Sequence, residues 1–386
     1  MNITEKLFDD GHLKSFDATV LSCEPIKKGF AIILDKTAFF PEGGGQLADV
    51  GTLNDAQVSD VKIKNEIITH ITDKPLEVGS IVHGEIDWNI RFRRMQNHSG
   101  EHIVSWIIHK MFGYDNVGFH MGTNEVTLDV NGLLTDDDIK TIEYKSNLAV
   151  VSNAKVTITY PSSDVLASLD YRSKLDITEN VRIVTIEGYD MCACCAPHVS
   201  NTGEIGIIKI LDAIHYKGGM RISMLCGLDA LEDYSQRNQS VMKISALLSA
   251  KQKEVVKAVE KLNNDIQEQK QIANKLKSQI LQVEIDKLKK VDGNLCIFEQ
   301  DFDMLSIRNL ANEGINFTDG ICAVFSGDDN SGYMYVMSSK NIPLRDKAKE
   351  INSTLKGKGG GSNEMIQGSV SATKQQILSY FDIKQD

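Results

Sequence analysis

The sequence predicts an α+β protein whose chain divides into four consecutive parts. Short strand-like runs interrupted by glycine fill the N-terminal part, and helical and strand-like patterns alternate after it. A stretch without Pro or Gly, rich in Lys, Gln and Glu, then precedes a small C-terminal part. We therefore expect a β domain over 1–90, an α+β domain over 91–231, a long helical segment over 232–291 and a small α/β domain over 292–386.

The first part is expected to be a compact, barrel-like β domain. Residues 18–26 and 29–37 are apolar or alternate in polarity, and residues 58–73 resemble a hairpin with a turn near Asn65. Glycines at positions 29, 43, 44, 45 and 51 favour tight turns over helices.

The second part opens with a predicted helix. Apolar residues recur at helical spacing from Ile103 to Met111, and Gly113 is a typical residue to end a helix. A further helix is expected to start at Thr135, whose hydroxyl can cap it, with Asp138 three residues later. Strand-like runs around these helices predict a mixed α+β domain.

The third part is typical of one long helix. One heptad position is mostly apolar from Val241 to Val283, whereas the second position that we count, from Ile244 to Gln279, is half polar. This pattern favours a helical hairpin or an imperfect coiled coil.

The fourth part combines strand-like runs with a glycine-rich segment. Residues 295–299, 322–327 and 333–339 are expected to be strands, and residues 373–381 a short helix. The run GKGGGS at 357–362 is expected to be a flexible loop whose backbone N–H groups could hold a phosphate.

The overall composition is that of an ordinary globular protein. The formal net charge of the 386 residues is −11, so charge as a whole gives no support to nucleic-acid binding. No apolar run approaches the roughly 20 residues that span a bilayer, and the first residues lack the pattern of a signal peptide. We therefore expect a cytoplasmic protein with no membrane segment. Three of the seven cysteines fall within four residues, which favours a metal or redox cluster over disulfides.

Two motifs nearly a hundred residues apart supply the ligands of one predicted metal site. His98 and His102 lie four residues apart on the first predicted helix and so share one face. Cys194 and His198 repeat this spacing. Three imidazoles and one thiolate at tetrahedral distance suit Zn²⁺, and we expect one ion per chain.

Alternatives to this interpretation stay open. The site could be a closed one that only braces the fold, and Cys192 or Cys195 could replace Cys194 as the sulfur ligand. The first motif also fits the H-x-x-E-H pattern of inverzincin peptidases, which makes Glu101 a candidate general base. Nothing in the sequence selects the downstream Glu ligand of those enzymes, so a peptidase is a minor alternative.

A second segment of interest runs from Thr37 to Gly51, with the sequence TAFFPEGGGQLADVG. Its three consecutive glycines allow a backbone to approach a ligand closely. Gln46 follows them and offers two hydrogen-bond donors and one acceptor. A tight turn with a polar tip is the competing interpretation.

Taken in order, these elements resemble the editing domain of alanyl-tRNA synthetases and, more closely, the free-standing alanyl-tRNA editing proteins of the long AlaX type. The matching segments are TAFFPEGGGQLADVG, HSGEH, CCAPHVSNTGEIGIIKI and KGGMRISMLCG. Further along, GKGGGSNEMIQGSV resembles the glycine-rich end of the DHH-associated C-terminal domain of the same synthetases. The synthetase motif usually reads Cys-Gly-Gly-Thr-His, whereas Cys195-Ala196-Pro197 fills its middle here.

The resemblance implies a trans-editing hydrolase that cleaves the ester joining Ser, or else Gly, to tRNA(Ala). His98, His102, Cys194 and His198 would then be zinc ligands. Thr37 and Gln46 would line the amino-acid pocket, with Thr37 reading the serine hydroxyl. The C-terminal domain would contact tRNA or, together with the helical segment, form a homodimer.

Several basic residues are candidate tRNA contacts, with an ordinary surface charge as the alternative for each. They are Arg91, Arg93, Arg94, Lys217, Arg221, Lys356 and Lys358. Two other functions stay open: a non-catalytic, dimerising tRNA-binding protein with a structural zinc, and hydrolysis of another aminoacyl-tRNA such as Ser-tRNA(Thr).

Overall fold

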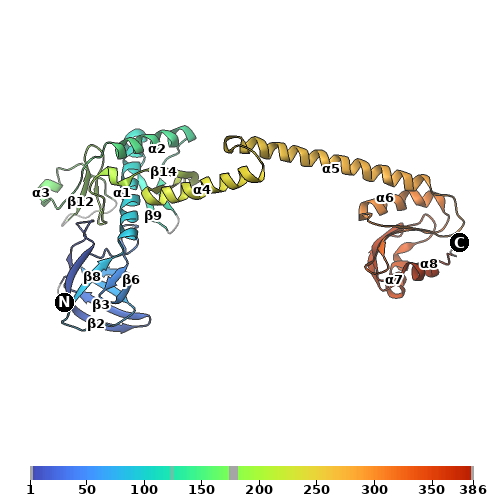
Figure 1. The fold of residues 1–386 in the computed structure, drawn as a ribbon, viewed down its shortest axis with the longest axis horizontal. Helices are drawn as coiled ribbons and strands as arrows, with labels where there is room; N and C mark the ends of the chain where they lie inside the picture. Colours follow the sequence, from blue (N-terminus) through green and yellow to red (C-terminus); the bar gives the residue numbers. More distant parts are fainter. Residues whose placement is uncertain (1–2, 123–124, 174–180, 384–386) are drawn as a thin grey trace. The chain divides into compact units, whose positions relative to one another are not determined.

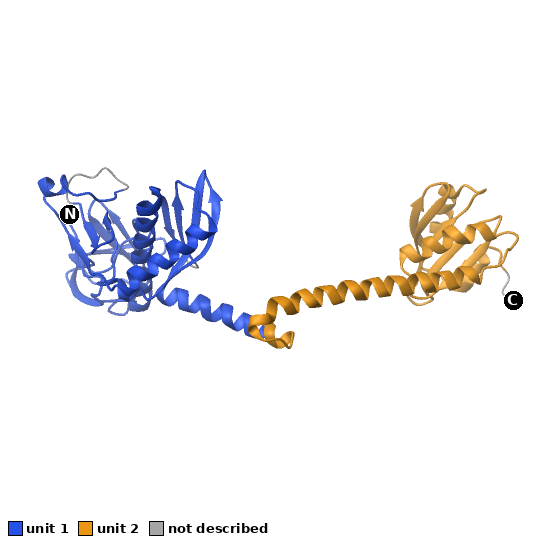
Figure 2. Ribbon diagram, turned by 90° about the horizontal axis from the view of Figure 1, so that it is seen from above, with its two compact units in different colours: residues 1–243 blue, residues 244–386 orange. Residues whose placement is uncertain are grey.

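The computed structural model describes residues 3–122, 125–173 and 181–383. It consists of two compact units, Met1–Lys243 and Ile244–Asp386, coloured separately in Figure 2. The α+β fold class is confirmed, whereas the finer division into four domains stays a prediction. Within the described ranges, every helix is too short or too polar to cross a bilayer.

A closed six-stranded barrel begins the first unit, as the sequence predicts. All its neighbouring strands are antiparallel, in the order β2-β3-β7-β6-β5-β8. Alternate residues of β7 and β8 are buried, because one face of each strand lines the barrel core. A short parallel pair joins β1 (Glu5–Lys6) to β4 (Lys36–Thr37). The barrel strands are β2 (Ser15–Ile26), β3 (Gly29–Leu34), β5 (Gly51–Leu53), β6 (Ala56–Lys64), β7 (Ile67–Thr72) and β8 (Ile81–Ile86).

Helix α1 (Trp88–Phe112) follows the barrel and forms the centre of the first unit (Figure 1). Asp87 caps its N-terminus by accepting a hydrogen bond from the Ile90 N–H, and Gly113 ends it with a φ of 71°. Every residue from Met95 to Ser105 is buried, so this stretch is enclosed on all sides. Its polar side chains must therefore find partners inside the protein.

Two sheets and a helix surround α1 in the first unit. A four-stranded antiparallel sheet has the order β14-β15-β10-β9, and a three-stranded one has the order β11-β12-β13. Thr135 and Asp138 form the predicted capping box of α2 (Asp136–Val151). The remaining elements are β9 (Asn116–Met121), β10 (Val126–Val130), β11 (Val156–Thr159), α3 (Ser163–Leu166), β12 (Ile183–Ile186), β13 (Met191–Ala193), η1 (Thr202–Ile205), β14 (Ile208–Tyr216) and β15 (Gly219–Cys226).

The predicted long helix is two helices, α4 (Gly227–Leu247) and α5 (Val255–Asp286). A left-handed residue, Ser249 with a φ of 49°, and the 3-10 turn η2 (Gln252–Glu254) separate them. On α5, exposed apolar side chains recur at spacings of three and four residues in two runs separated by ten residues, as in an interrupted coiled-coil seam. They are Val259, Leu262, Ile266, Leu276, Ile280 and Val283.

The second unit contains a five-stranded mixed sheet with helices against it. Its strand order is β16-β17-β18-β20-β19, and only β16 and β17 are parallel neighbours. The strands predicted at 295–299, 322–327 and 333–339 are confirmed as β16 (Leu295–Glu299), β17 (Cys322–Asp328) and β18 (Gly332–Ser338). The other elements are α6 (Met304–Gly314), η3 (Ile315–Phe317), α7 (Leu344–Thr354), β19 (Gly357–Gly361), β20 (Met365–Val370) and α8 (Lys374–Tyr380).

The glycine run of this unit is not the flexible loop that the sequence predicts. It forms the edge strand β19, which pairs with β20. A Cβ atom at Gly359 would lie 2.4 Å from the Tyr335 hydroxyl and 2.5 Å from the Gln367 carbonyl oxygen. At this position only glycine, which has no Cβ atom, can pack so closely. The strand therefore contains glycine and resembles a loop in its composition.

Candidate metal centre

Helix α1 presents His98 and His102 one turn apart on the same face, with ring centroids 5.3 Å apart. Both side chains are almost fully buried. The segment after β13 brings Cys194 and His198 against them, and the His198 ring lies 4.9 Å from His98 and 4.6 Å from His102. The two motifs predicted to meet therefore do meet.

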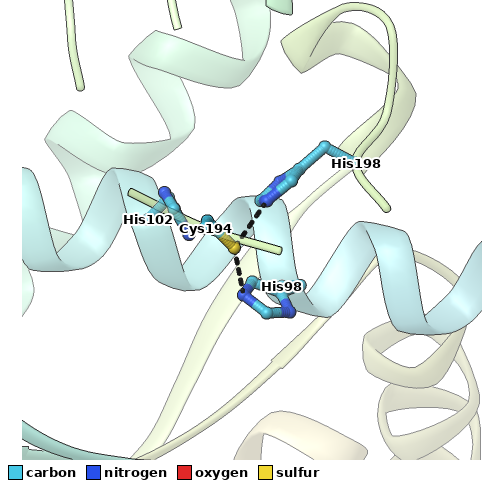
Figure 3. A group of neighbouring side chains, drawn as sticks. All are labelled: His98, His102, Cys194 and His198. Carbon is cyan, nitrogen blue, oxygen red and sulfur yellow. Dashed lines mark hydrogen bonds between the residues drawn. The ribbon is translucent and has the colours of Figure 1, made fainter. Parts of the chain in front are cut away.

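One nitrogen or sulfur atom from each of these four residues lies within 4.8 Å of the other three (Figure 3). Cys194 Sγ is 3.5 Å from His98 Nε2 and 3.4 Å from His198 Nε2. Tetrahedral zinc ligands at normal bond lengths have sulfur–nitrogen separations of about 3.6 Å. The donor set and its spacing thus fit a tetrahedral metal ion, and we call these four residues the His/Cys cluster.

Each histidine of the cluster has a partner for its second ring nitrogen. His98 Nδ1 lies 2.8 Å from Gln46 Oε1, and His102 Nδ1 lies 2.9 Å from Asp190 Oδ2. These oxygens can only accept, so both rings carry a proton on Nδ1 and turn Nε2 toward the cluster. His198 Nδ1 pairs with the Ser99 hydroxyl at 2.9 Å. Such outer partners are what metal-binding histidines ordinarily have.

Two arginines, the partly buried Arg172 and the buried Arg182, hold the surrounding backbone and carboxylate in place. Arg172 binds both oxygens of Asp190 through Nε and Nη2, each at 2.7 Å. Arg182 donates from Nη1 to the carbonyl oxygens of Cys194 and Ala196, at 2.7 and 3.0 Å. The cysteine-rich segment is therefore fixed by side-chain hydrogen bonds as well as by its short strand.

The cluster residues alter one another's protonation. Burial raises the pKa of the Cys194 thiol, but the adjacent His98 and His198 outweigh burial and hold that pKa well below 9.0. Burial lowers the pKa of His198 to about 3. Burial also lowers the pKa of His102, but its hydrogen bonds to Asp190 and Cys194, together with the charges of Cys192 and Cys194, outweigh burial and hold the pKa well above 6.5. A metal ion would find a thiolate and a neutral imidazole in place, and would compete with a proton on His102.

Of the three clustered cysteines, Cys194 is the one grouped with the three histidines. Cys195 is exposed, and its sulfur faces the backbone of Gly43 and Gly44. Cys192 lies near His102 and Asp190 instead. Because Arg172 already occupies both oxygens of Asp190, that second group is a poor metal site.

The glycine-rich segment docks beside the cluster. Gly45 accepts a hydrogen bond from the Met121 N–H of β9, and a Cβ atom at Gly45 would lie 2.7 Å from the Phe119 carbonyl oxygen. This close approach explains the glycine and its φ of 84°. Gln46 is buried, and its Nε2 atom has no hydrogen-bond partner among the described residues.

The other two predicted catalytic residues lie in different surroundings. Thr37 is fully buried in the barrel, where its hydroxyl lies 2.8 Å from His70 Nε2. Glu101 is buried on α1, and its Oε1 accepts hydrogen bonds from the Ser105 hydroxyl and the Asn116 amide. The structure therefore joins Gln46 directly to the His/Cys cluster, whereas the hydrogen bonds of Thr37 and Glu101 are with other residues.

The structure corrects the expectation for Arg91. This side chain is fully buried, where it pairs with Asp49 and donates to the carbonyl oxygens of Gly11 and Ala38. It therefore ties α1 to the barrel and has no exposed surface for tRNA. Asp190 and His70 could not be predicted from the sequence, because no local pattern reveals partners that are distant in the chain.

The remaining basic candidates lie at or near the surface. Arg93 pairs with Asp229 and Glu232, and Arg94 donates to the Ala48 carbonyl oxygen. Both arginines line a cavity of about 530 Å³ that also includes Leu47 and Met121, neighbours of the docked glycine segment. Arg221 pairs with Asp129, and Lys217 lies over the Tyr216 ring. In the second unit, Lys356 and Lys358 are exposed.

Two models of known protein families match segments of the first unit. A family model described as the threonyl and alanyl tRNA synthetase second additional domain matches residues 181–226, which include Cys194 and His198. A model described as tRNA synthetases class II (A) matches residues 12–90, which include the barrel.

Individual relatives resemble the chain over most of its length. It is 28% identical over 386 residues to the alanyl-tRNA editing protein Aarsd1 of Mus musculus, covering 95% of this chain and 93% of that protein. It is 29% identical over 394 residues to the alanyl-tRNA editing protein AlaX-L of Pyrococcus horikoshii, covering 96% and 95%. An alanine–tRNA ligase of Ignicoccus hospitalis is 30% identical over 305 residues, covering 75% of this chain. The chain spans only 33% of that ligase.

Proposed function

Because this chain is a homologue, over nearly its whole length, of proteins named alanyl-tRNA editing proteins, we propose that it hydrolyses the ester of tRNA(Ala) that carries a wrong amino acid. Serine is the proposed amino acid, with glycine as the second candidate. One observation links this function to the candidate site: the buried Nε2 of Gln46 has no hydrogen-bond partner among the described residues. A buried, unpaired donor costs about 1–3 kcal/mol, so a ligand oxygen bound there would be stabilised.

Gln46 is the proposed donor to the ester carbonyl. His98 holds its Oε1, so the orientation of the amide is fixed and Nε2 faces away from the His98 ring. A fixed donor at the carbonyl oxygen stabilises the negative charge that develops there as water attacks. Thr37 is the proposed reader of the serine hydroxyl. Glu101 has its own buried partners, so we assign it no step.

His98, His102, Cys194 and His198 are the proposed ligands of one Zn²⁺ ion per chain. Their donor types, their spacing and the partners of their Nδ1 atoms support this choice. When bound, Zn²⁺ would supply polarisation of the ester or fix the terminal adenosine. The role of these residues is to bind the ion, whereas Gln46 orients the substrate.

Arg93 and Arg94 are proposed tRNA contacts; they line the cavity beside the glycine-rich segment together with Glu125, Asp229, Glu232 and Asp233. Lys217 and Arg221 of the first unit, and Lys356 and Lys358 of the second, are further proposed phosphate contacts. Phosphate contacts release counterions, so tRNA affinity is expected to fall steeply with added salt. The homodimer and the cytoplasmic location are likewise proposals.

The alternative is a non-catalytic, tRNA-binding protein whose ion only stabilises the fold. The presence of four protein ligands favours this alternative, because structural zinc sites are typically closed by four protein ligands. Removing the metal with a chelator distinguishes the two. The catalytic proposal expects hydrolysis of Ser-tRNA(Ala) to stop while tryptophan fluorescence shows a folded first unit, and to return when zinc is added. Unfolding on chelation, with no hydrolysis by the loaded protein, would contradict it.

A further inference from the structure

Thr37 and His70 form a buried pair whose hydrogen-bond direction can be deduced. His70 lies on β7 inside the barrel, directly opposite Ile32 of β3. Its Nδ1 faces the Ile32 carbonyl oxygen at 3.3 Å, and its Nε2 faces the Thr37 hydroxyl at 2.8 Å. Both His70 and Thr37 are fully buried.

A carbonyl oxygen has no proton to give, so the proton between Ile32 and His70 must be on Nδ1. Burial lowers the pKa of His70 to about 4, which agrees with a neutral ring. The Nε2 of a neutral ring protonated at Nδ1 is a bare acceptor. The Thr37 hydroxyl must therefore donate its only proton to His70.

The Thr37 hydroxyl oxygen has a second hydrogen-bond partner. The Phe39 N–H donates to it at 3.1 Å. A hydroxyl has one proton and two lone pairs, so one lone pair of Thr37 remains. Toward any further group enclosed beside it, Thr37 can only accept.

We propose that His70 is a positioning residue that fixes the Thr37 hydroxyl as a hydrogen-bond acceptor, so that the site selects amino acids whose side chain donates a hydrogen bond. Serine donates through its hydroxyl, whereas alanine and glycine leave the Thr37 lone pair unpaired, so this proposal favours serine over glycine as the substrate. A buried polar group left without its partner is what gives such pockets strong discrimination. This inference rests on the proposed function for its substrate, but the direction of the Thr37–His70 hydrogen bond does not.

The hydrogen-bond direction is tested on the full-length protein labelled with ¹⁵N-histidine. The expected spectrum at pH 7 has His70 protonated at Nδ1 and bare at Nε2. Resonances are assigned by their loss in a His70→Gln variant, with His83→Gln, at an exposed strand position, as the matched control. A His70 protonated at Nε2 would overturn the proposal, whatever the activity.

The selectivity is tested with tRNA(Ala) acylated with serine, 2,3-diaminopropionate, 3-fluoroalanine or alanine. The first two side chains donate hydrogen bonds, and 3-fluoroalanine is a serine-sized analogue that cannot. The wild type is expected to hydrolyse the donor esters at least about tenfold faster than the other two. Equal rates for the serine and 3-fluoroalanine esters would overturn the proposal.

Two substitutions at position 70 separate positioning from packing. His70→Phe keeps a ring but removes the acceptor of the Thr37 proton. The ratio of the hydrolysis rates of the serine and 3-fluoroalanine esters should therefore fall to less than about threefold. His70→Gln retains an acceptor near the Nε2 position and should restore the ratio. An unchanged ratio in a folded His70→Phe variant would contradict the proposal. If no ester is hydrolysed, the proposed function fails, and the spectrum alone decides the hydrogen-bond direction.

Discussion

Gln46 Oε1 accepts a hydrogen bond from His98 Nδ1 at 2.8 Å, which joins the glycine-rich segment directly to the His/Cys cluster. The two residues are 52 positions apart in the chain and come from the segment after strand β4 and from the central helix. One amide thereby orients a candidate metal ligand with its oxygen, while its nitrogen has no hydrogen-bond partner among the described residues.

Gln46→Glu should separate the two roles of the amide. The carboxylate keeps an acceptor for His98 but removes the Nε2 donor, so metal content should be unchanged. Loss of one fixed donor to a developing oxyanion lowers kcat by about 10²–10³-fold. Single-turnover hydrolysis of Ser-tRNA(Ala), with zinc measured on the same samples, checks this. Wild-type kcat with full metal content would show that Gln46 does not contact the reacting carbonyl.

Asp190→Asn should weaken metal binding. The neutral amide removes the negative charge that pairs with His102 and Arg172. Loss of such an outer partner of a metal-binding histidine typically lowers metal affinity by about 10–100-fold. Competition with a chromophoric chelator measures the change. Asp164→Asn, an exposed position on α3, is the matched control. Equal zinc affinity in the two variants would argue against a metal held by His102.

Arg91→Met should destabilise the first unit instead of weakening tRNA binding. It leaves the buried Asp49 carboxylate without its charged partner, which costs about 3–5 kcal/mol. Both tryptophans, Trp88 and Trp106, lie in this unit, so urea unfolding followed by tryptophan fluorescence reports on it. The exposed pair of Arg237 and Asp233 provides the control, since Arg237→Met should cost less than about 1 kcal/mol.

His70 should make the first unit less stable in acid. Its pKa in the folded state is about 4, below the ordinary 6.5, so the unfolded chain binds the proton more tightly. The stability contributed by the neutral ring is therefore complete above pH 6.5 and is lost as the pH falls toward 4, by roughly 3 kcal/mol in all. Urea unfolding between pH 7 and 4 should show a smaller loss for His70→Phe than for the wild type. An identical pH dependence would mean that His70 does not titrate on unfolding.

The exposed apolar seam of α5 should mediate self-association. A second copy of this seam would bury the side chains that recur at heptad spacing. Leu276→Lys in the seam should lower the dimer fraction in sedimentation velocity, whereas Lys275→Glu beside it should not. A wild-type monomer at all concentrations would rule out this seam as a dimer contact.

The sequence predicts the parts of this protein that depend on local spacing. His98 and His102 meet because one helix carries both, and Thr135 and Asp138 form their capping box for the same reason. Asp190 could not be predicted in this way, because its partner His102 lies 88 positions away and is brought near by tertiary packing.

Composition misled the prediction in other places. The positive charge of Arg91 predicted a surface position. The side chain instead lies in the interior, where it pairs with the carboxylate of Asp49, 42 positions earlier. Glycine content suggested a loop at 357–362, but pairing with β20 makes Gly357–Gly361 a strand.

A comparison of two esters decides whether this site removes serine from tRNA(Ala). Purified, zinc-loaded protein is mixed with Ser-tRNA(Ala) or Ala-tRNA(Ala), and release of the amino acid is followed over time. We expect rapid loss of serine and at least about tenfold slower loss of alanine, because alanine leaves the remaining lone pair of the buried Thr37 hydroxyl without a partner. Release of both amino acids at the same rate, or of neither, would contradict it.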